Sequence, residues 1–330
     1  MNKIQRLLLP LTVLLGIFVF HLSASAELPA APFPPTPTPA PEGVEELDRI
    51  QTAVENAIAA ESENVLSFLV NHEQVENIEI SPDGDTAIAW IVLKDPETGE
   101  ILPIEPGLAF AVKDPDTGWS VILPSDPNWV DQLQGAPAEL VSEELKQFWL
   151  EMLAEQIESA NLGPLGGYLL PWAKGNIAWL SQSVAHDKYT PSGSAHYAFD
   201  FYVPQTMFNL YASKPGIVWY ARWDVSNNNH VGVGNYLVLQ DNSTNPATYQ
   251  LYLHLAQNSI PPALRARGAP VVQGQFIGIA DNTGQSSGHH LHFQVHTNPN
   301  SYWGTSVDIT FADVAINGGR PRVHNSYYSD

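Results

Sequence analysis

The stretch GQSSGHHLHFQVH, residues 284–296, is predicted to contain a β-strand with metal-binding or catalytic side chains. Three of its histidines fall within four consecutive positions. In a strand, residues i and i+2 project from the same face, so His290 and His292 would present their imidazoles side by side. Gly284 and Gly288 permit a tight turn before the strand and a close approach of another backbone. An isolated His-x-His pair is more often structural than functional, so the rest of the chain decides its meaning.

The other histidines favour a metal site, since eight of the eleven lie between residues 186 and 296 and the chain has no cysteine. Ligands in such a chain must be imidazoles and carboxylates rather than thiolates. The segment HYAFDF, 196–201, places Asp200 between two phenylalanines, where a carboxylate is costly unless it is paired or bound to a metal. The segment YLHLAQ, 252–257, places His254 in an apolar strand, although a lone strand histidine is more often a satisfied core residue.

Residues 166–330 are predicted to form a mainly β domain. Short runs rich in β-branched and aromatic residues indicate strands over residues 217–220, 236–239, 249–255, 276–279 and 291–295. No long amphipathic helix appears in this half of the chain. We therefore expect antiparallel sheets that form a groove.

Residues 43–165 are predicted to form a separate small α+β domain. Apolar residues at three- and four-residue spacing predict a helix over 44–58, and the pattern continues through Val65, Phe68 and Leu69. A second helix is expected over 142–157, with Ser142 as its cap. Strands are expected between these helices, over residues 75–80, 86–93, 108–112 and 119–123. This region shows no catalytic constellation, and His72 is its only histidine.

The first 26 residues have the pattern of a secretory signal peptide, with a basic start, an apolar run over 7–20 and an Ala-Ser-Ala cleavage site. A proline-rich linker follows over residues 27–42. We expect a secreted protein, extracellular or in the cell envelope, with no membrane span once the signal is cleaved. The net charge of −21 makes a nucleic-acid partner improbable, since phosphate binding requires a basic surface. The excess is confined to residues 42–160, which hold 26 acidic and 4 basic residues, whereas residues 166–330 hold 8 of each.

The order of these motifs resembles that of the lysostaphin-type and β-lytic zinc metalloendopeptidases, which cut peptidoglycan peptides. In this family an H…D motif is followed by a Tyr-x-His-Leu strand and then by a Gly-rich stretch that ends in H-L-H-F. Here the same order appears as HYAFDF, YLHL and GIADNTGQSSGHHLHF. Intervening landmarks also recur over residues 210–220, 231–240 and 267–284. The resemblance covers roughly residues 175–312 and implies a duplicated hybrid motif-like fold with one zinc ion.

By this resemblance, the zinc ligands are an upstream histidine, Asp200 and His292, while one of His254 and His290 acts as general base and the other as hydrogen-bond donor. The upstream ligand is His186 or His196. We favour His186, because it ends the apolar run IAWLSQSVAH, which is a plausible strand, and the loop after it has the Pro, Ser and Gly that a return toward Asp200 requires. His196 would need a bend to join Asp200, since residues four apart in an extended strand lie about 13 Å apart. The chain departs from the family at His289, where a proline is usual, and at Gln294, where a glutamate is often found.

The resemblance thus implies an enzyme that hydrolyses peptide bonds with zinc and acts on peptidoglycan cross-links, with Gly-rich peptides as an alternative substrate. One alternative is a non-catalytic peptidoglycan-binding or activator module of the same fold, although such a module would be free to lose the four site residues. Another alternative makes the acidic N-terminal domain the main functional part, as a binding or inhibitory module. We expect that domain to be dispensable for hydrolysis of a small soluble peptide.

Overall fold

The computed structural model describes residues 42–154, 162–183, 186 and 194–329. The predicted signal peptide and all of the predicted linker except Glu42 lie outside the described residues. Residues 41–330 form one compact unit. Within the described ranges, no helix is both long and apolar enough to cross a membrane.

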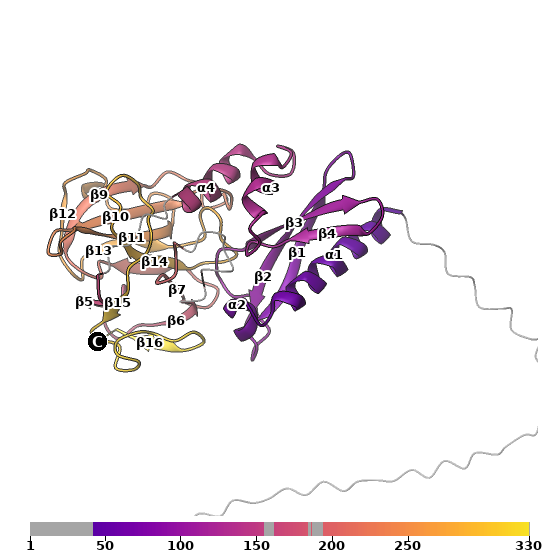
Figure 1. Ribbon diagram of the computed structural model, residues 1–330. Helices are drawn as coiled ribbons and strands as arrows, with labels where there is room; N and C mark the ends of the chain where they lie inside the picture. Colours follow the sequence, from indigo (N-terminus) through magenta and orange to yellow (C-terminus); the bar gives the residue numbers. More distant parts are fainter. Residues whose placement is uncertain (1–41, 155–161, 184–185, 187–193, 330) are drawn as a thin grey trace, which may run out of the picture. The chain divides into compact units, whose positions relative to one another are not determined.

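An α+β layer begins the described chain, with one long helix packed against a four-stranded antiparallel sheet (Figure 1). The helix α1 buries Ile50, Val54 and Ile58 on one face, as its apolar spacing predicts. The sheet follows the order β1-β2-β3-β4, so each strand pairs with the next one in the chain. The bounds are α1 (Glu42–Glu61), β1 (His72–Ile80), β2 (Thr86–Lys94), β3 (Gly107–Asp114) and β4 (Gly118–Ile122).

The helices of this layer differ in part from the prediction. The apolar pattern continues to Leu69, but α1 ends at Glu61 and α2 (Leu66–Val70) is a separate helix. Between them Ser62 donates its hydroxyl hydrogen to the carbonyl oxygen of Ala59, a local bond that competes with helix continuation. A further helix, α3 (Trp129–Gly135), was not predicted.

The predicted cap of the last helix is confirmed. In α4 (Glu143–Ala154), the backbone N–H of Leu145 donates to the Ser142 hydroxyl over 3.2 Å. The predicted end of this helix at residue 157 lies outside the described residues.

The C-terminal half is mainly β, as predicted, and its strands join into a ten-stranded, antiparallel sheet. The path runs β12-β9-β10-β11-β14-β7-β6-β16, and β13 connects β11 with β8. A short parallel pair joins β15 to β5. The bounds are β5 (Leu165–Tyr168), β6 (Ile177–Gln182), β7 (Phe199–Tyr202), β8 (Phe208–Tyr211), β9 (Gly216–Arg222), β10 (Asn235–Asp241), β11 (Thr248–Leu255), the 3-10 helix η1 (Pro262–Leu264), β12 (Pro270–Val271), β13 (Phe276–Ala280), β14 (Leu291–His296), β15 (Ile309–Phe311) and β16 (Ser326–Tyr328).

The central strand β11 is buried along its whole length because both of its faces are covered. On one face Tyr252 and Leu255 join an apolar core with residues of β7, β13 and β14. On the other face Leu251 and Leu253 pack in a core that includes Phe148 and Trp149 of α4. The helices of the N-terminal part thus help to bury the sheet that carries the predicted site residues.

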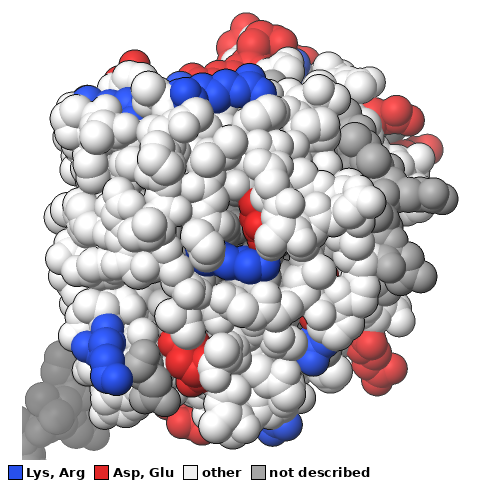
Figure 2. Space-filling view, turned by 90° about the vertical axis from the view of Figure 1, so that its left-hand side faces the viewer, with Lys and Arg blue, Asp and Glu red and all other residues white. Residues whose placement is uncertain are grey.

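Charged residues are sparse on the exposed face of the β domain that Figure 2 presents, where single Lys, Arg, Asp and Glu side chains lie among uncharged ones. This agrees with the balanced charge of residues 166–330. The acidic excess of the chain therefore belongs to the preceding α+β layer.

Candidate metal centre

Strand register brings Asp200 and His292 together. The two residues are direct partners across the antiparallel pair formed by β7 and β14. Directly opposed residues project from the same face with their Cβ atoms about 5 Å apart. Nδ1 of His292 accordingly lies 3.1 Å from Oδ1 of Asp200, and both side chains are buried.

A β-bulge brings His254 to the same face. Tyr236 of β10 pairs with Leu253 and Asn235 pairs with Leu255, so His254 is the extra residue of the bulge. Its φ of 65° is a left-handed conformation that a non-glycine residue rarely adopts, and bulges of this kind often redirect a side chain beside an active site. In a regular strand His254 would share the face of Tyr252; instead its ring centroid lies 4.5 Å from that of His290.

His186, rather than His196, reaches Asp200. His186 follows β6, and its Nε2 lies 2.9 Å from Oδ2 of Asp200. His196 is half-buried, with its ring packed edge-on against Tyr197 at 4.5 Å. Among the residues that the structure describes, His196 belongs to neither cluster of potential metal ligands.

Glu105 is the one site residue that the sequence did not indicate. It lies between β2 and β3, in the part of the chain for which no catalytic constellation was expected, and it joins the site residues of the β domain. Its Oε1 lies 2.9 Å from both Nε2 of His254 and Nδ1 of His292. The two ligand clusters therefore share it: Glu105 with His186, Asp200 and His292, and Glu105 with His254 and His290. A single glutamate in a chain with so many acidic residues gives no signal by composition or spacing.

In each of the four clustered histidines, one ring nitrogen contacts an oxygen acceptor that is not part of the cluster. Nδ1 of His186 lies 2.5 Å from the carbonyl oxygen of Ser183, Nδ1 of His254 lies 2.8 Å from that of Thr283, and Nδ1 of His290 lies 3.0 Å from that of Gly288. Because a carbonyl oxygen only accepts, these Nδ1 atoms carry the hydrogen, which leaves each Nε2 directed into the cluster.

His292 has the opposite arrangement of its two ring nitrogens. The side-chain amide nitrogen of Gln294 donates to the carbonyl oxygen of Gly304 over 2.9 Å, so the amide oxygen faces Nε2 of His292 at 3.2 Å. Nε2 therefore donates, and Nδ1 is the nitrogen that faces Asp200 and Glu105. The ring also stacks on Trp303, with centroids 5.1 Å apart.

Two buried carboxylates face these histidines, and the charges are strongly interdependent. Burial alone would raise the pKa of Glu105, but the charge of His292 and the hydrogen bond with His254 outweigh it and hold that pKa well below its usual range. Burial likewise opposes the charge on His292, yet Glu105 and Asp200 raise its pKa to about 10. The centre therefore requires positive charge between its two carboxylates.

The residues fit a zinc ion on this evidence. One ring nitrogen of His186 and one of His292 lie 2.9 Å and 3.1 Å from the carboxylate oxygens of Asp200, close enough for one ion to bind all three residues. All three side chains are buried. Among the described residues, Nε2 of His290 and Oε2 of Glu105 are buried without a hydrogen-bond partner. Two imidazoles and one carboxylate are a ligand set that catalytic zinc uses, with a further position left open.

The remaining histidines of this region have structural partners. His296 is buried between the carbonyl oxygen of Tyr302 and the backbone N–H of Asn298, and burial lowers its pKa to about 3. Nδ1 of His289 lies 2.7 Å from Oδ1 of Asp281. Both contacts hold loops around the centre rather than the centre itself.

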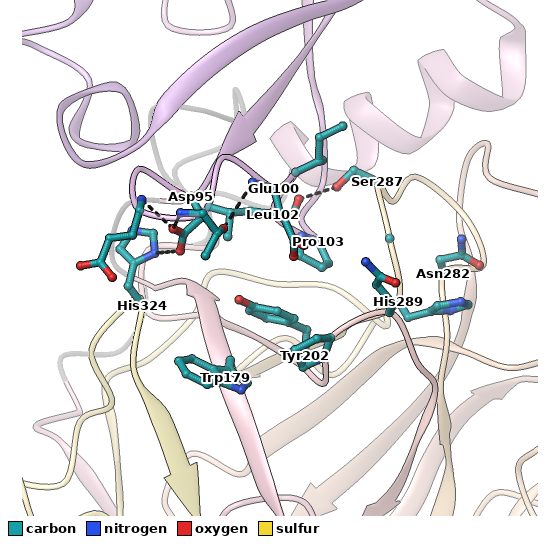
Figure 3. Close-up of a pocket in the computed structure, with 16 residues that line it drawn as sticks. Asp95, Glu100, Leu102, Pro103, Trp179, Tyr202, Asn282, Ser287, His289 and His324 are labelled. Carbon is teal, nitrogen blue, oxygen red and sulfur yellow. Dashed lines mark hydrogen bonds and ion pairs between the residues drawn. The ribbon is translucent and has the colours of Figure 1, made fainter. Parts of the chain in front are cut away.

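A cavity of about 720 Å³ opens beside the centre. Figure 3 shows Trp179 and Tyr202 on one side of it, with Pro103 above them and His289 at the other end. The aromatic side chains come from β6 and β7, the strands that precede His186 and contain Asp200. The cavity is therefore formed partly by the β domain and partly by the segment that contains Glu105.

The antiparallel β domain thus carries a buried cluster of histidines and carboxylates that could hold a metal ion, beside an open cavity. Residues 194–303 match the family model of peptidase family M23. The matched range contains Asp200, His254, His290 and His292, whereas His186 and Glu105 precede it.

Individual proteins are similar to parts of this chain. The peptidoglycan DD-endopeptidase ShyA of Vibrio cholerae serotype O1 is 36% identical over 86 residues, which are 26% of this chain and 17% of that protein. The chain thus spans about a sixth of its curated relative. The catalytic domain of lysostaphin from Staphylococcus simulans is 27% identical, with a TM-score of 0.27 over 43% of this chain and 86% of that one. The catalytic domain of the M23 protein EnpA from Enterococcus faecalis is 20% identical, with a TM-score of 0.31 over 42% of this chain and 94% of that one.

Proposed function

We propose that this chain is an exported zinc metalloendopeptidase that hydrolyses peptide cross-links of peptidoglycan. The observation that carries the proposal is the register pair of Asp200 and His292, with His186 on the other oxygen of the same carboxylate. The match of residues 194–303 to the model of peptidase family M23 supports the reaction class. The similarity to a peptidoglycan DD-endopeptidase supports the substrate class.

In this proposal His186, Asp200 and His292 are the zinc ligands. When bound, the ion would lower the pKa of water and polarise the scissile carbonyl group. Gln294 keeps Nδ1 of His292 free of hydrogen and directed inward, and the carbonyl oxygen of Ser183 does the same for Nε2 of His186.

His254 and His290 move the protons. Burial lowers the pKa of His254, so its Nε2 is a neutral acceptor suited to remove a proton from the attacking water and return it to the leaving amine. Burial opposes the charge on His290, but Glu105 and Asp200 raise its pKa above the usual value. Its Nε2–H is therefore suited to stabilise the negative oxygen that develops on the carbonyl group.

The proposal is tested by zinc content and by cleavage on the full chain. We expect about one zinc ion per chain and, in mass spectrometry of digested peptidoglycan, muropeptides cut at a peptide bond. Asp200→Ala and His292→Ala should each abolish zinc binding and cleavage. Full zinc occupancy in either variant would refute the ligand assignment.

The same experiment addresses the alternative of a non-catalytic peptidoglycan-binding or activator module. Such a module would bind peptidoglycan and release no muropeptides whether or not zinc is present. The intact group of Asp200, His254, His290 and His292 favours the enzyme, because binding alone requires no second pair of histidines beside the ligands.

A further inference from the structure

Gln182, the last residue of β6, is a buried side chain whose amide has no partner in the described chain. It is 1% exposed, and neither its amide nitrogen nor its amide oxygen forms a hydrogen bond with any described residue. Among the residues that the structure describes, it is the only side chain for which two buried polar atoms both lack a partner. A buried amide without hydrogen bonds is costly, so the position of this side chain requires an explanation.

Two other buried glutamines of the same sheet show the pattern of a structural role. In β11 the amide of Gln250 forms hydrogen bonds through both of its polar atoms with the backbone of Lys214. In β14 the amide of Gln294 joins His292 to a backbone carbonyl oxygen. Both of these amides are satisfied within the protein. Gln182 therefore differs from them in kind, and a structural role does not account for its amide.

A β-bulge turns Gln182 toward the face of the sheet that carries the metal centre. Leu180 pairs with Phe201 in β7. The next pair joins Gln182 to Asp200, so Ser181 is the extra residue of the bulge. In a regular strand Gln182 would share the face of Leu180, which belongs to an apolar core. Instead it lies directly opposite Asp200, with the two Cβ atoms about 5 Å apart.

The same face of β6 and β7 leads into the open cavity. Tyr202 lies two residues after Asp200, so the two side chains share a face, and Trp179 is the direct partner of Tyr202. Trp179 and Tyr202 line the cavity beside the centre, where Figure 3 shows them on one side. The pair of Gln182 and Asp200 is therefore the next row on this face, about 7 Å further along β7. A peptide that extends from the cavity to the metal centre would pass Gln182.

The free amide of Gln182 is complementary to the backbone of an extended peptide. The side-chain nitrogen of glutamine donates hydrogen bonds and its oxygen accepts them. In an extended chain, the N–H and the carbonyl oxygen of one residue point to the same edge, so one amide can pair with both. Gln250 makes this double contact with Lys214 inside the protein. Gln182 has the same two atoms available on the face of the metal centre.

We propose that Gln182 is a substrate-binding residue, whose amide pairs with the N–H and the carbonyl oxygen of one residue of an extended peptide beside Asp200. The inference rests on the proposed function of the same centre. Because the contact involves only backbone atoms, it holds the peptide next to the metal ligands whatever side chain that residue carries. Since Gln182 is buried in the free protein, binding includes displacement of the groups that cover it. The cost of the unpartnered amide in the free protein is then a feature of the binding site.

Gln182→Leu in the full chain distinguishes substrate binding from a structural role. Leucine has a similar volume and no polar side-chain atoms, so the variant removes two unpartnered groups from the interior. We expect the Tm of the metal-free protein to rise by about 2–4 °C. Gln250→Leu is the matched control and should lower the Tm, because the amide of Gln250 forms hydrogen bonds. Gln182→Met keeps the unbranched shape of glutamine and carries the same expectation should leucine pack poorly, and a lower Tm in both Gln182 variants would overturn the proposal.

The second readout is steady-state cleavage of a purified cross-linked muropeptide by the zinc-loaded proteins. KM should rise about tenfold in Gln182→Leu with little change in kcat, as for neutral hydrogen bonds made equally in the ground and transition states. Zinc content should stay the same, because the amide forms no hydrogen bond with a ligand residue. Gln250→Leu should retain the KM of the unmodified protein. An unchanged KM in Gln182→Leu, or a loss of zinc from it, would overturn the role in substrate binding.

Binding of a simple peptide separates this inference from the proposed function. The probe is N-acetyl-tetraalanine amide, and its affinity for each zinc-loaded protein is measured by calorimetry. We expect about tenfold weaker binding to Gln182→Leu than to the unmodified protein or to Gln250→Leu. Equal affinity in all three would overturn the proposal for Gln182. Weaker binding to Gln182→Leu without muropeptide cleavage by any of the proteins would support the role of Gln182 and refute the proposed peptidase function.

Discussion

Gln294→Leu should weaken zinc binding without removing a ligand. The side-chain amide of Gln294 is 0% exposed and joins Nε2 of His292 at 3.2 Å to the carbonyl oxygen of Gly304 at 2.9 Å. Leucine has a similar volume but neither contact, so His292 would lose the acceptor that keeps Nδ1 directed inward. Loss of such a supporting partner raises the zinc dissociation constant by about 10–100-fold, or about 1.4–2.8 kcal/mol.

The same substitution should lower the free energy of unfolding of the metal-free protein. It leaves the imidazole N–H and the carbonyl group of Gly304 buried without partners, and each such group costs about 1–3 kcal/mol. Zinc affinity is measured by competition with a chromophoric chelator, and stability by denaturant unfolding.

Gln250→Leu is the matched control, because Gln250 is buried on the neighbouring strand β11 and makes no contact with the centre. Its amide oxygen accepts from the backbone N–H of Lys214 and its amide nitrogen donates to the carbonyl oxygen of the same residue. We expect a similar loss of stability with unchanged zinc affinity. If Gln294→Leu binds zinc as tightly as the unmodified protein, or if Gln250→Leu weakens zinc binding equally, the proposed orientation of His292 is refuted.

Three further outcomes follow from the site and its surroundings. His186→Ala should lose zinc whereas His196→Ala should retain it, as measured by metal content, and the reverse result would restore the shorter spacing to Asp200. His290→Ala should keep zinc but lose cleavage activity by on the order of a hundredfold, and near-normal turnover would show a structural role. Because burial lowers the pKa of His296 to about 3, the unfolded chain binds the extra proton first, so stability should fall as the pH drops from about 6.5 toward 3. His296→Gln should flatten that decline in pH-dependent unfolding, and an unchanged slope would contradict the assignment.

The β domain was predictable because its pattern is local. Alternating apolar residues and turn residues mark β9, β10, β11, β13 and β14, and the structure confirms each of them within a few residues. The expectation that His290 and His292 share a face follows from the two-residue period of a strand alone. The short strands β5, β8 and β16 carry too few alternating positions for the same reasoning.

Other features of the site depend on tertiary structure. His254 faces His290 only because of a bulge opposite Asn235, and nothing in the YLHL motif indicates an extra residue. Glu105 reaches the histidines from a connection that is 149 residues distant from His254. Its neighbours in the sequence, Ile104 and Pro106, do not distinguish it from the other acidic residues of that half.

The register between β7 and β14 couples metal binding to correct assembly of the sheet. A shift of one residue in either strand would carry Asp200 or His292 to the opposite face, and the ligand pair would be lost as a whole rather than loosened. Under the proposed metal dependence, a misassembled chain would therefore be inert and not weakly active. Zinc would stabilise the correctly assembled chain selectively, because only chains that have paired these two strands correctly could gain the free energy of metal binding.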